Sequence, residues 1–226
     1  MDIACIWEHH GPSTLLWARD YPGVCTRGPS LAAAQEKLPA ALEAYCLWAG
    51  LRAPEAALPV IVQEKASELT ISDADSDVLF DGERGPLSET EYRRLKALAL
   101  RSAQEFLALF DSIPDPDRSA LPVRSTFYGT KPRTAREMYE HVKNVNAYYF
   151  GEIGVAADNA GTICSCREAG FGLLETQPKF LENAVFSGSY GEDRTLKKVL
   201  RRFLWHDRIH AAAMQRMAWK TFGVRL

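Results

Sequence analysis

The chain has 226 residues, 46% of them hydrophobic and 25% charged, which fits one large or two small globular domains. Its formal net charge of −2 provides no overall attraction to nucleic acid or to an anionic membrane surface, so we expect neither partner. No apolar run approaches 18 residues and the N-terminus lacks a signal-peptide pattern, so the sequence predicts neither a membrane span nor secretion.

The first 84 residues predict a small α/β domain of the ββαβ type. Short β-prone runs at 3–8, 13–20 and 58–64 predict strands, and a weaker fourth strand is expected near 78–80. Residues 21–28 contain the Pro-Gly pair of a turn and are expected to be a loop.

One helix is expected between the second and third of these strands. Ser30 is a favourable N-cap, and apolar residues then recur every three or four positions up to about Ala49. Gly50 ends the pattern, and Pro39 is expected to kink the helix or strain its register.

A Gly- and Pro-containing boundary at 81–86 separates this domain from an all-α second domain, residues 85–226. Four helical segments are expected in it, which predicts a four-helix bundle and an α+β two-domain protein overall. The expected helices are 88–113, 134–151, 172–187 and 194–220, with long connections at 114–133 and 155–171.

Two histidines in the last helix, His206 and His210, are one helical turn apart. This spacing places both imidazoles on one face, where they can bind one metal ion. The same face carries an apolar stripe that includes Val199, Phe203 and Met214, so the pair is expected to be buried. A buried imidazole needs partners for its ring nitrogens, and a pair of them therefore requires an explanation.

His141, in the expected second helix, is the candidate for a third ligand. It lies on the stripe that also carries Met138 and Tyr148, so a helix packed against the last one would bring three imidazoles together. Three histidines with an open fourth position are typical of a catalytic metal site. The alternative is that the three are core histidines with separate buried acceptors.

Two segments resemble a known family. Leu196–His210 is similar to the last helix, and Arg136–Tyr149 to the second helix, of the DinB-like (YfiT-like) superfamily of metal-dependent four-helix bundles. The resemblance covers roughly residues 88–222. It implies a divalent ion, zinc or nickel, held by His141, His206 and His210. Members of this superfamily include transferases and isomerases that use low-molecular-weight thiols, so the resemblance implies this kind of activity.

The N-terminal domain resembles a HicB-like fold. The resemblance lies in the Pro-Gly turn at 22–23 and the Ala-rich helix that follows it. HicB-like antitoxins usually carry a DNA-binding element after this unit. A helical bundle follows here instead, so antitoxin function is not expected.

Several further residues are candidates for the site. Tyr148 could donate a proton to a reactant, and the alternative is that it is an aromatic residue of the core. Arg202 could bind an anionic group of the substrate, and the alternative is that its side chain extends into solvent. Cys164 and Cys166, expected in an irregular segment, could add a thiol or form a redox pair, or they could be unrelated thiols. The odd total of five scattered cysteines is typical of reduced thiols, which favours a cytoplasmic location.

Two functional hypotheses follow from these patterns. In the first, the three-histidine site activates water or a low-molecular-weight thiol for transfer, hydrolysis or isomerisation of a small molecule. In the second, the protein is a non-enzymatic binding or regulatory module, in which the HicB-like domain binds a partner and the bundle supports it or forms a homodimer. The sequence does not choose among metals, because imidazoles suit several of them.

Overall fold

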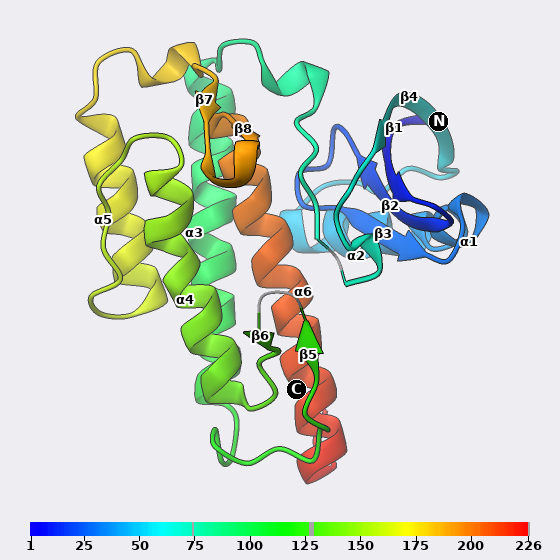
Figure 1. Ribbon diagram of the computed structural model, residues 1–226, viewed down its shortest axis with the longest axis vertical. Helices are drawn as coiled ribbons and strands as arrows, with labels where there is room; N and C mark the ends of the chain where they lie inside the picture. The colour runs from blue at the N-terminus through cyan, green and yellow to red at the C-terminus, as the bar shows by residue number, and fades with distance from the viewer. Residues whose placement is uncertain (74, 127–128, 226) are drawn as a thin grey trace. The chain divides into compact units, whose positions relative to one another are not determined.

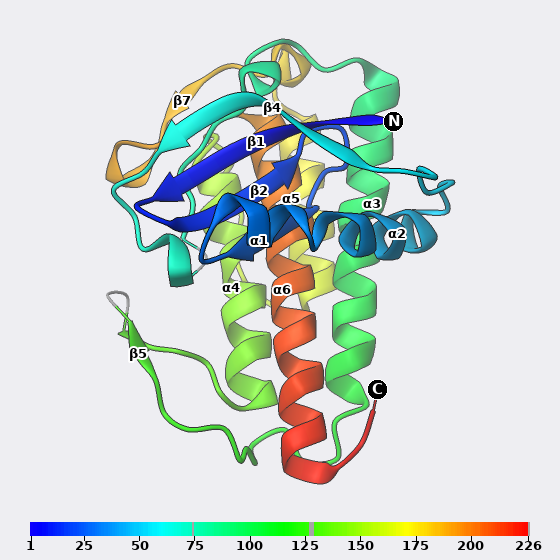
Figure 2. The ribbon, with the colours of Figure 1, turned by 90° about the vertical axis from the view of Figure 1, so that its right-hand side faces the viewer.

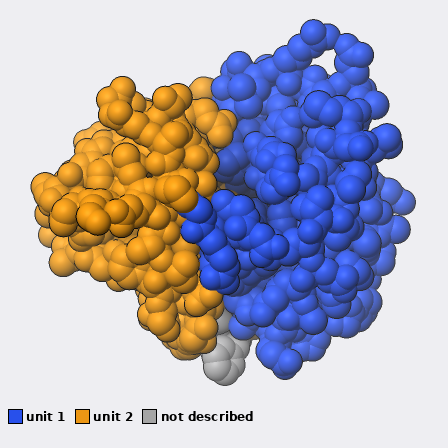
Figure 3. Space-filling model, turned by 90° about the horizontal axis from the view of Figure 1, so that it is seen from above, with its two compact units in different colours: residues 1–85 blue, residues 86–226 orange. Residues whose placement is uncertain are grey.

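The computed structural model describes residues 1–73, 75–126 and 129–225, which form two compact units, Met1–Gly85 and Pro86–Leu226 (Figure 3). We call them the sheet unit and the helical unit. The fold is α+β, with a small sheet in the N-terminal unit and the long helices in the C-terminal one, as the sequence predicts (Figure 1).

The sheet unit contains a four-stranded sheet in the order β3-β2-β1-β4. Strands β1, β2 and β3 are antiparallel neighbours, whereas β4 runs parallel to β1. The strands are β1 (Asp2–His10), β2 (Ser13–Ala18), β3 (Cys25–Gly28) and β4 (Leu58–Ala66).

Two expectations for this sheet are wrong. Residues 25–28 form strand β3, because the turn occupies only the residues before them and Gly23 adopts a positive φ of 90° there. Residues 78–80 are not a strand. The backbone N–H groups of Asp77 and Val78 donate to the buried Glu8 carboxylate at 2.8 and 3.2 Å, so they make no ladder bonds.

The single helix expected in this unit is two helices, α1 (Leu31–Gln35) and α2 (Leu38–Ala49). Pro39 lies in the first turn of α2, where its missing N–H removes no helical hydrogen bond, so it begins a helix instead of kinking one. Gly50 ends α2 with a φ of 69°. Both helices pack against one face of the sheet (Figure 2), and the core between them contains buried side chains of Ile3, Cys5, Leu16, Leu38, Leu42 and Tyr45.

Four long helices lie side by side in the helical unit (Figures 1 and 2). They are α3 (Glu89–Asp111), α4 (Ala135–Gly151), α5 (Ile163–Glu175) and α6 (Leu196–Phe222). Each begins at a hydroxyl residue whose side chain accepts a backbone N–H of the first turn, namely Ser88, Thr134, Thr162 and Thr195.

The third of these helices is not where the sequence analysis placed it. Helix α5 begins nine residues before the expected start, at a capping box between Thr162 and Ser165, and it ends before Pro178. Gly170 lies inside α5 at a close approach to α4, where a Cβ atom would come within 2.2 Å of the Phe150 ring. It is therefore a packing position and not a helix breaker.

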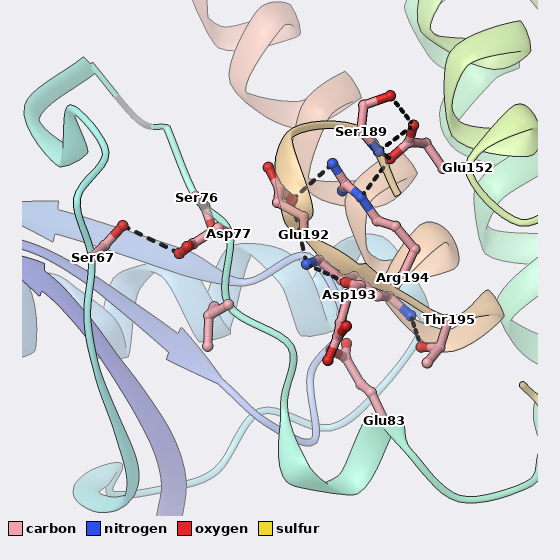
Figure 4. A network of polar contacts seen from close by, with 12 residues as sticks. Ser67, Ser76, Asp77, Glu83, Glu152, Ser189, Glu192, Asp193, Arg194 and Thr195 are labelled. Atoms are coloured by element: carbon pink, nitrogen blue, oxygen red, sulfur yellow. Dashed lines mark hydrogen bonds and ion pairs between the residues drawn. The ribbon is translucent and has the colours of Figure 1, made fainter. Parts of the chain in front are cut away.

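Short elements complete the helical unit. These are the hairpin strands β5 (Ser125–Thr126), β6 (Gly129–Thr130), β7 (Phe186–Ser187) and β8 (Asp193–Arg194). The β7–β8 hairpin is held to the end of α4 by Glu152, whose carboxylate accepts hydrogen bonds from Ser189 and Arg194 (Figure 4). No helix in the described ranges is long and apolar enough to cross a membrane.

Candidate metal centre

The candidate centre lies between the middle of α4 and the middle of α6. Helix α4 is fixed at its start by a capping box in which Thr134 and Glu137 exchange hydrogen bonds. Met138 and Val142 bury one side of this helix and thereby orient His141. Helix α6 buries its predicted apolar stripe, namely Leu196, Val199, Phe203, Met214 and Met217, and this places the two remaining histidines in mid-helix.

The structure brings together His141, His206 and His210. His141 on α4 precedes His206 on α6 by 65 residues. One ligand nitrogen from each lies within 4.8 Å of the others. The three ring centroids are separated by 5.0, 4.7 and 4.4 Å. The three imidazoles thus form one compact cluster of metal-ligand atoms.

The spacing within the cluster fits a shared ion. The Nε2 atoms of His141 and His206 are 3.1 Å apart. Two nitrogens at about 2.0–2.1 Å from a tetrahedral zinc ion are about 3.3–3.4 Å apart. Without an ion, the contact is a hydrogen bond in which one neutral imidazole donates and the other accepts. The buried Nδ1 of His206 has no hydrogen-bond partner among the described residues, and an ion bound at Nε2 would leave this second nitrogen as it is.

The surroundings keep the three imidazoles neutral. Burial lowers the pKa of His206 well below its ordinary value, and the nearby His210 and His141 add to this effect. Burial also lowers the pKa of His210 to about 3, with contributions from His141 and Lys131. His141 is the most exposed of the three, and desolvation lowers its pKa as well. Neutral imidazole is the form that binds a metal ion, so no proton has to be displaced at neutral pH.

The residue that follows His206 on α6 belongs to a buried ion pair that the sequence analysis missed. This residue, Asp207, accepts two hydrogen bonds from the guanidinium of Arg167 on α5. Arg167 also donates a hydrogen bond to the side chain of Asn146 on α4, which is fully buried. A sequence pattern does indicate that Arg167 is buried, because Arg167 lies on the same apolar helical stripe as Ile163 and Phe171. This pattern can be recognised only when α5 is given its correct bounds.

The two candidates for a catalytic role, Tyr148 and Arg202, lie at different distances from the histidine cluster. Tyr148 is 38% exposed, and its hydroxyl accepts a hydrogen bond from Arg194 at 3.2 Å, two helical turns beyond His141. Its neighbour Tyr149 lies beside the cluster, with its ring centroid 6.0 Å from that of His206. Arg202 is half-buried, with its guanidinium over the rings of Tyr149 and Trp205.

The two cysteines named as candidates lie outside the histidine cluster. Cys164 and Cys166 are in the first turns of α5, not in an irregular segment, and neither joins the histidine cluster in the described part of the chain. Both are free thiols, and burial raises the pKa of each. Of the polar residues near His141 on α4, Glu137 is engaged in the helix cap and Asn144 is exposed.

Comparisons with protein-family models, with curated proteins and with solved structures find no match to this chain. Its function therefore has to be inferred from the geometry and charge of the three-histidine cluster.

Proposed function

We propose that this protein is a metal-dependent enzyme in which His141, His206 and His210 hold one divalent ion. The observation that carries the proposal is the cluster itself, with ligand nitrogens from two helices within 4.8 Å of one another. Three histidines leave coordination positions for water or substrate, which is typical of catalytic zinc sites and not of structural ones. Zinc and nickel are the preferred candidates, because the resemblance to the DinB-like superfamily implies them and imidazole suits both.

The proposed reaction is thiol transfer, hydrolysis or isomerisation of a small molecule. A bound divalent ion would supply Lewis acidity, lowering the pKa of a water molecule or a low-molecular-weight thiol toward neutrality. The chain itself contributes three neutral imidazoles in fixed positions. His141 is exposed whereas His206 is buried, so a reactant would approach the cluster from the side of His141.

We also propose relationships for the two units. The helical unit would be a DinB-like bundle, a proposal supported by the position of His141 on the second long helix and of His206 and His210 on the last. The sheet unit would have a HicB-like fold, supported by its turn at Pro22–Gly23 and the helices that follow. A reducing, cytoplasmic setting suits this function, since all five cysteines are free.

A second candidate function is a non-enzymatic, metal-binding regulatory module. The observation in its favour is that no carboxylate joins the three histidines in the described part of the chain, so no acidic general base lies among the ligands. In this case metal binding would stabilise the helical unit or a homodimer without turnover. A screen of the zinc-loaded protein with low-molecular-weight thiols and electrophilic substrates separates the two candidates, because turnover is expected only for the enzyme.

The first test of the enzyme proposal is metal stoichiometry. Purified protein dialysed against limiting zinc is expected to hold about one equivalent, measured by elemental analysis. Each of the variants His141→Ala, His206→Ala and His210→Ala is expected to bind zinc at least about tenfold more weakly, because one of three protein ligands is lost.

The matched control is His9→Ala, which removes an imidazole from strand β1 in the sheet unit. It is expected to leave zinc affinity unchanged. A full equivalent of zinc at unchanged affinity in His206→Ala protein would show that the proposed site is wrong.

A further inference from the structure

The helical unit contains a cavity that lies apart from the histidine cluster. Its volume is about 250 Å³, and its lining comes from the residue after α4 and its neighbours, the end of α5, the segment 177–186 and the first residue of α6. None of the three histidines lines it. Leu196, which does, precedes His206 by ten residues, about 15 Å along the axis of α6. The cavity is therefore separate from the proposed metal centre.

Most of the cavity lining is apolar. Three of the lining side chains belong to the core and are at most 3% exposed, namely Ile153, Leu174 and Leu196. Phe180 and Phe186 add two aromatic rings, and Phe186 is 37% exposed, so it lines the cavity and also reaches solvent. Apolar surface of this kind gains free energy when the carbon atoms of a ligand replace water.

One wall of the cavity is a short turn with an unusual backbone. Lys179 and Asn183 both have a left-handed φ, 62° and 56°, and the one-turn helix η3 (Phe180–Glu182) lies between them. This conformation is unfavourable for a lysine, because its Cβ atom crowds a carbonyl oxygen. The turn is nevertheless fixed, since Asn183 Oδ1 accepts a backbone N–H of α6 at 3.0 Å and the Leu181 carbonyl accepts the Leu87 N–H at 2.9 Å. Strained backbone that is held in this way is typical of binding sites, and it gives the cavity a preformed wall.

The open side of the cavity carries two opposite charges. Lys179 and Glu182 both line the cavity, and their side chains are 76% and 65% exposed. Lys179 Nζ lies 3.1 Å from Glu182 Oε1, so the two charges balance each other. A ligand with a charged group would have to separate this pair or lose part of its own hydration. This balance favours a ligand without charge.

We propose that this cavity binds a small uncharged molecule with an apolar body. An apolar cavity of about 150 Å³ is large enough for benzene. A cavity of about 250 Å³ therefore has room for one aromatic ring that carries a short alkyl chain. The site does not depend on the proposed metal-dependent function, because it shares no residue with the histidine cluster.

The probe for the test is 3-phenylpropan-1-ol, which combines one ring with a three-carbon chain and has no charge. It is titrated into the full-length, isotope-labelled protein, and the amide chemical shifts are followed by NMR. Saturable shifts are expected at lining residues such as Leu174 and Phe186, with a dissociation constant of about 1 mM or tighter for a ligand of this size. The charged analogues 3-phenylpropanoate and 3-phenylpropan-1-amine are expected to bind at least about threefold more weakly.

Phe186→Ala removes one of the two aromatic rings of the lining and is expected to weaken binding of the alcohol about tenfold. Val185→Ala is the matched control, because Val185 is the adjacent residue, is 45% exposed and does not line the cavity. It is expected to leave the affinity unchanged. Circular dichroism reports whether each variant folds, and if Phe186→Ala does not, the location of the shifts in the wild type decides the outcome.

Each part of the proposal can fail separately. Shifts that do not saturate, or that saturate only at residues remote from the cavity, would overturn the site. A carboxylate or amine analogue that binds as tightly as the alcohol would overturn the assigned class of ligand. Unchanged affinity in folded Phe186→Ala would show that the alcohol binds elsewhere. The titration is repeated with zinc and with a chelator, and an affinity that depends on zinc would contradict the independence of the two sites.

Discussion

Arg167 on α5 and Asp207 on α6 form a bidentate ion pair inside the helical unit, with Nη2 donating to Oδ1 at 3.1 Å and Nη1 donating to Oδ2. Their side chains are 0% and 2% exposed. The same guanidinium donates to the Ala99 carbonyl on α3 and to the Asn146 side chain on α4. One side chain therefore links all four long helices, and its partner on α6 is the residue next to His206.

Removal of this arginine is expected to destabilise the helical unit strongly. Arg167→Met leaves Asp207 buried without its counter-ion, which typically costs about 3–5 kcal/mol. The double variant Arg167→Met/Asp207→Leu is expected to recover part of the loss, since no unpaired charge remains. Urea denaturation followed by circular dichroism gives the unfolding free energies.

The control for this experiment is Arg93→Met, which breaks an exposed ion pair with Glu89 on α3. Its expected cost is at most about 1 kcal/mol. A loss in Arg167→Met as small as that of the control would contradict the role we assign to the buried pair.

Two glycines on α5 are expected to respond oppositely to alanine. A methyl group at Gly170 would lie 2.2 Å from the Phe150 ring, so Gly170→Ala forces α4 and α5 apart and is expected to destabilise by about 1–3 kcal/mol. A methyl group at Gly172 meets no atom within 4 Å, and Gly172→Ala is expected to stabilise by about 0.5–1 kcal/mol. Thermal unfolding of the two variants tests the sign of each effect, and equal shifts would count against the close helix approach.

The stability of the sheet unit is expected to depend on pH through Glu8. Burial raises the pKa of this carboxyl. The hydrogen bonds that it accepts from Ser76, the Asp77 backbone and Trp17 lower the pKa, but by less. A carboxyl whose pKa is higher in the folded than in the unfolded chain binds more protons when folded. Its contribution to stability therefore falls as pH rises from the unfolded pKa, about 4.3, through the folded pKa.

The measurement is the unfolding free energy of wild type and Glu8→Gln as a function of pH. The value for wild type minus that for Glu8→Gln is expected to decrease as pH rises through this interval and then level off. Glu55→Gln removes one exposed carboxylate and serves as the charge-matched control. A difference that grows with pH would contradict the direction of the pKa shift.

Metal binding is expected to stabilise the helical unit. An ion that binds only the folded chain adds about 2.7 kcal/mol when its free concentration is 100 times the dissociation constant. Added zinc should therefore raise the unfolding midpoint, and a chelator should reverse the change. The variant His141→Ala should show a clearly smaller response to both, whereas His9→Ala should behave as the wild type does. A zinc-dependent midpoint in His141→Ala of the same size would indicate binding elsewhere.

Much of the candidate site could be predicted from local periodicity. The i, i+4 spacing of His206 and His210 fixes their shared helical face, and apolar neighbours fix which face is buried. The choice between Tyr148 and Tyr149 could not be made in this way. Adjacent helical residues point about 100° apart, and a small error in the assumed inward direction of α4 exchanges one tyrosine for the other.

The elements of the fold that were predicted wrongly depend on contacts between segments that are distant in the sequence. Gly170 looks like a helix breaker until the Phe150 ring of another helix is known to pack against it. Val78 is as β-prone as any strand residue, but its N–H is taken by Glu8, 70 residues away. Neither partner can be identified from the neighbouring sequence, because tertiary contacts override local propensity at these positions.

Strand β4 also bears on how the chain avoids association with copies of itself. It forms one edge of the sheet and exposes Leu58, Val60 and Val62, which makes it a template for strand addition while chains are still folding. Pro59 offers no N–H, and the pairing of β4 with β1 shifts register between Cys5 and Ile6, so the edge is not a regular ladder. Pro59 therefore removes one donor from the edge at which a second chain could pair, although this residue adds little to the folded core.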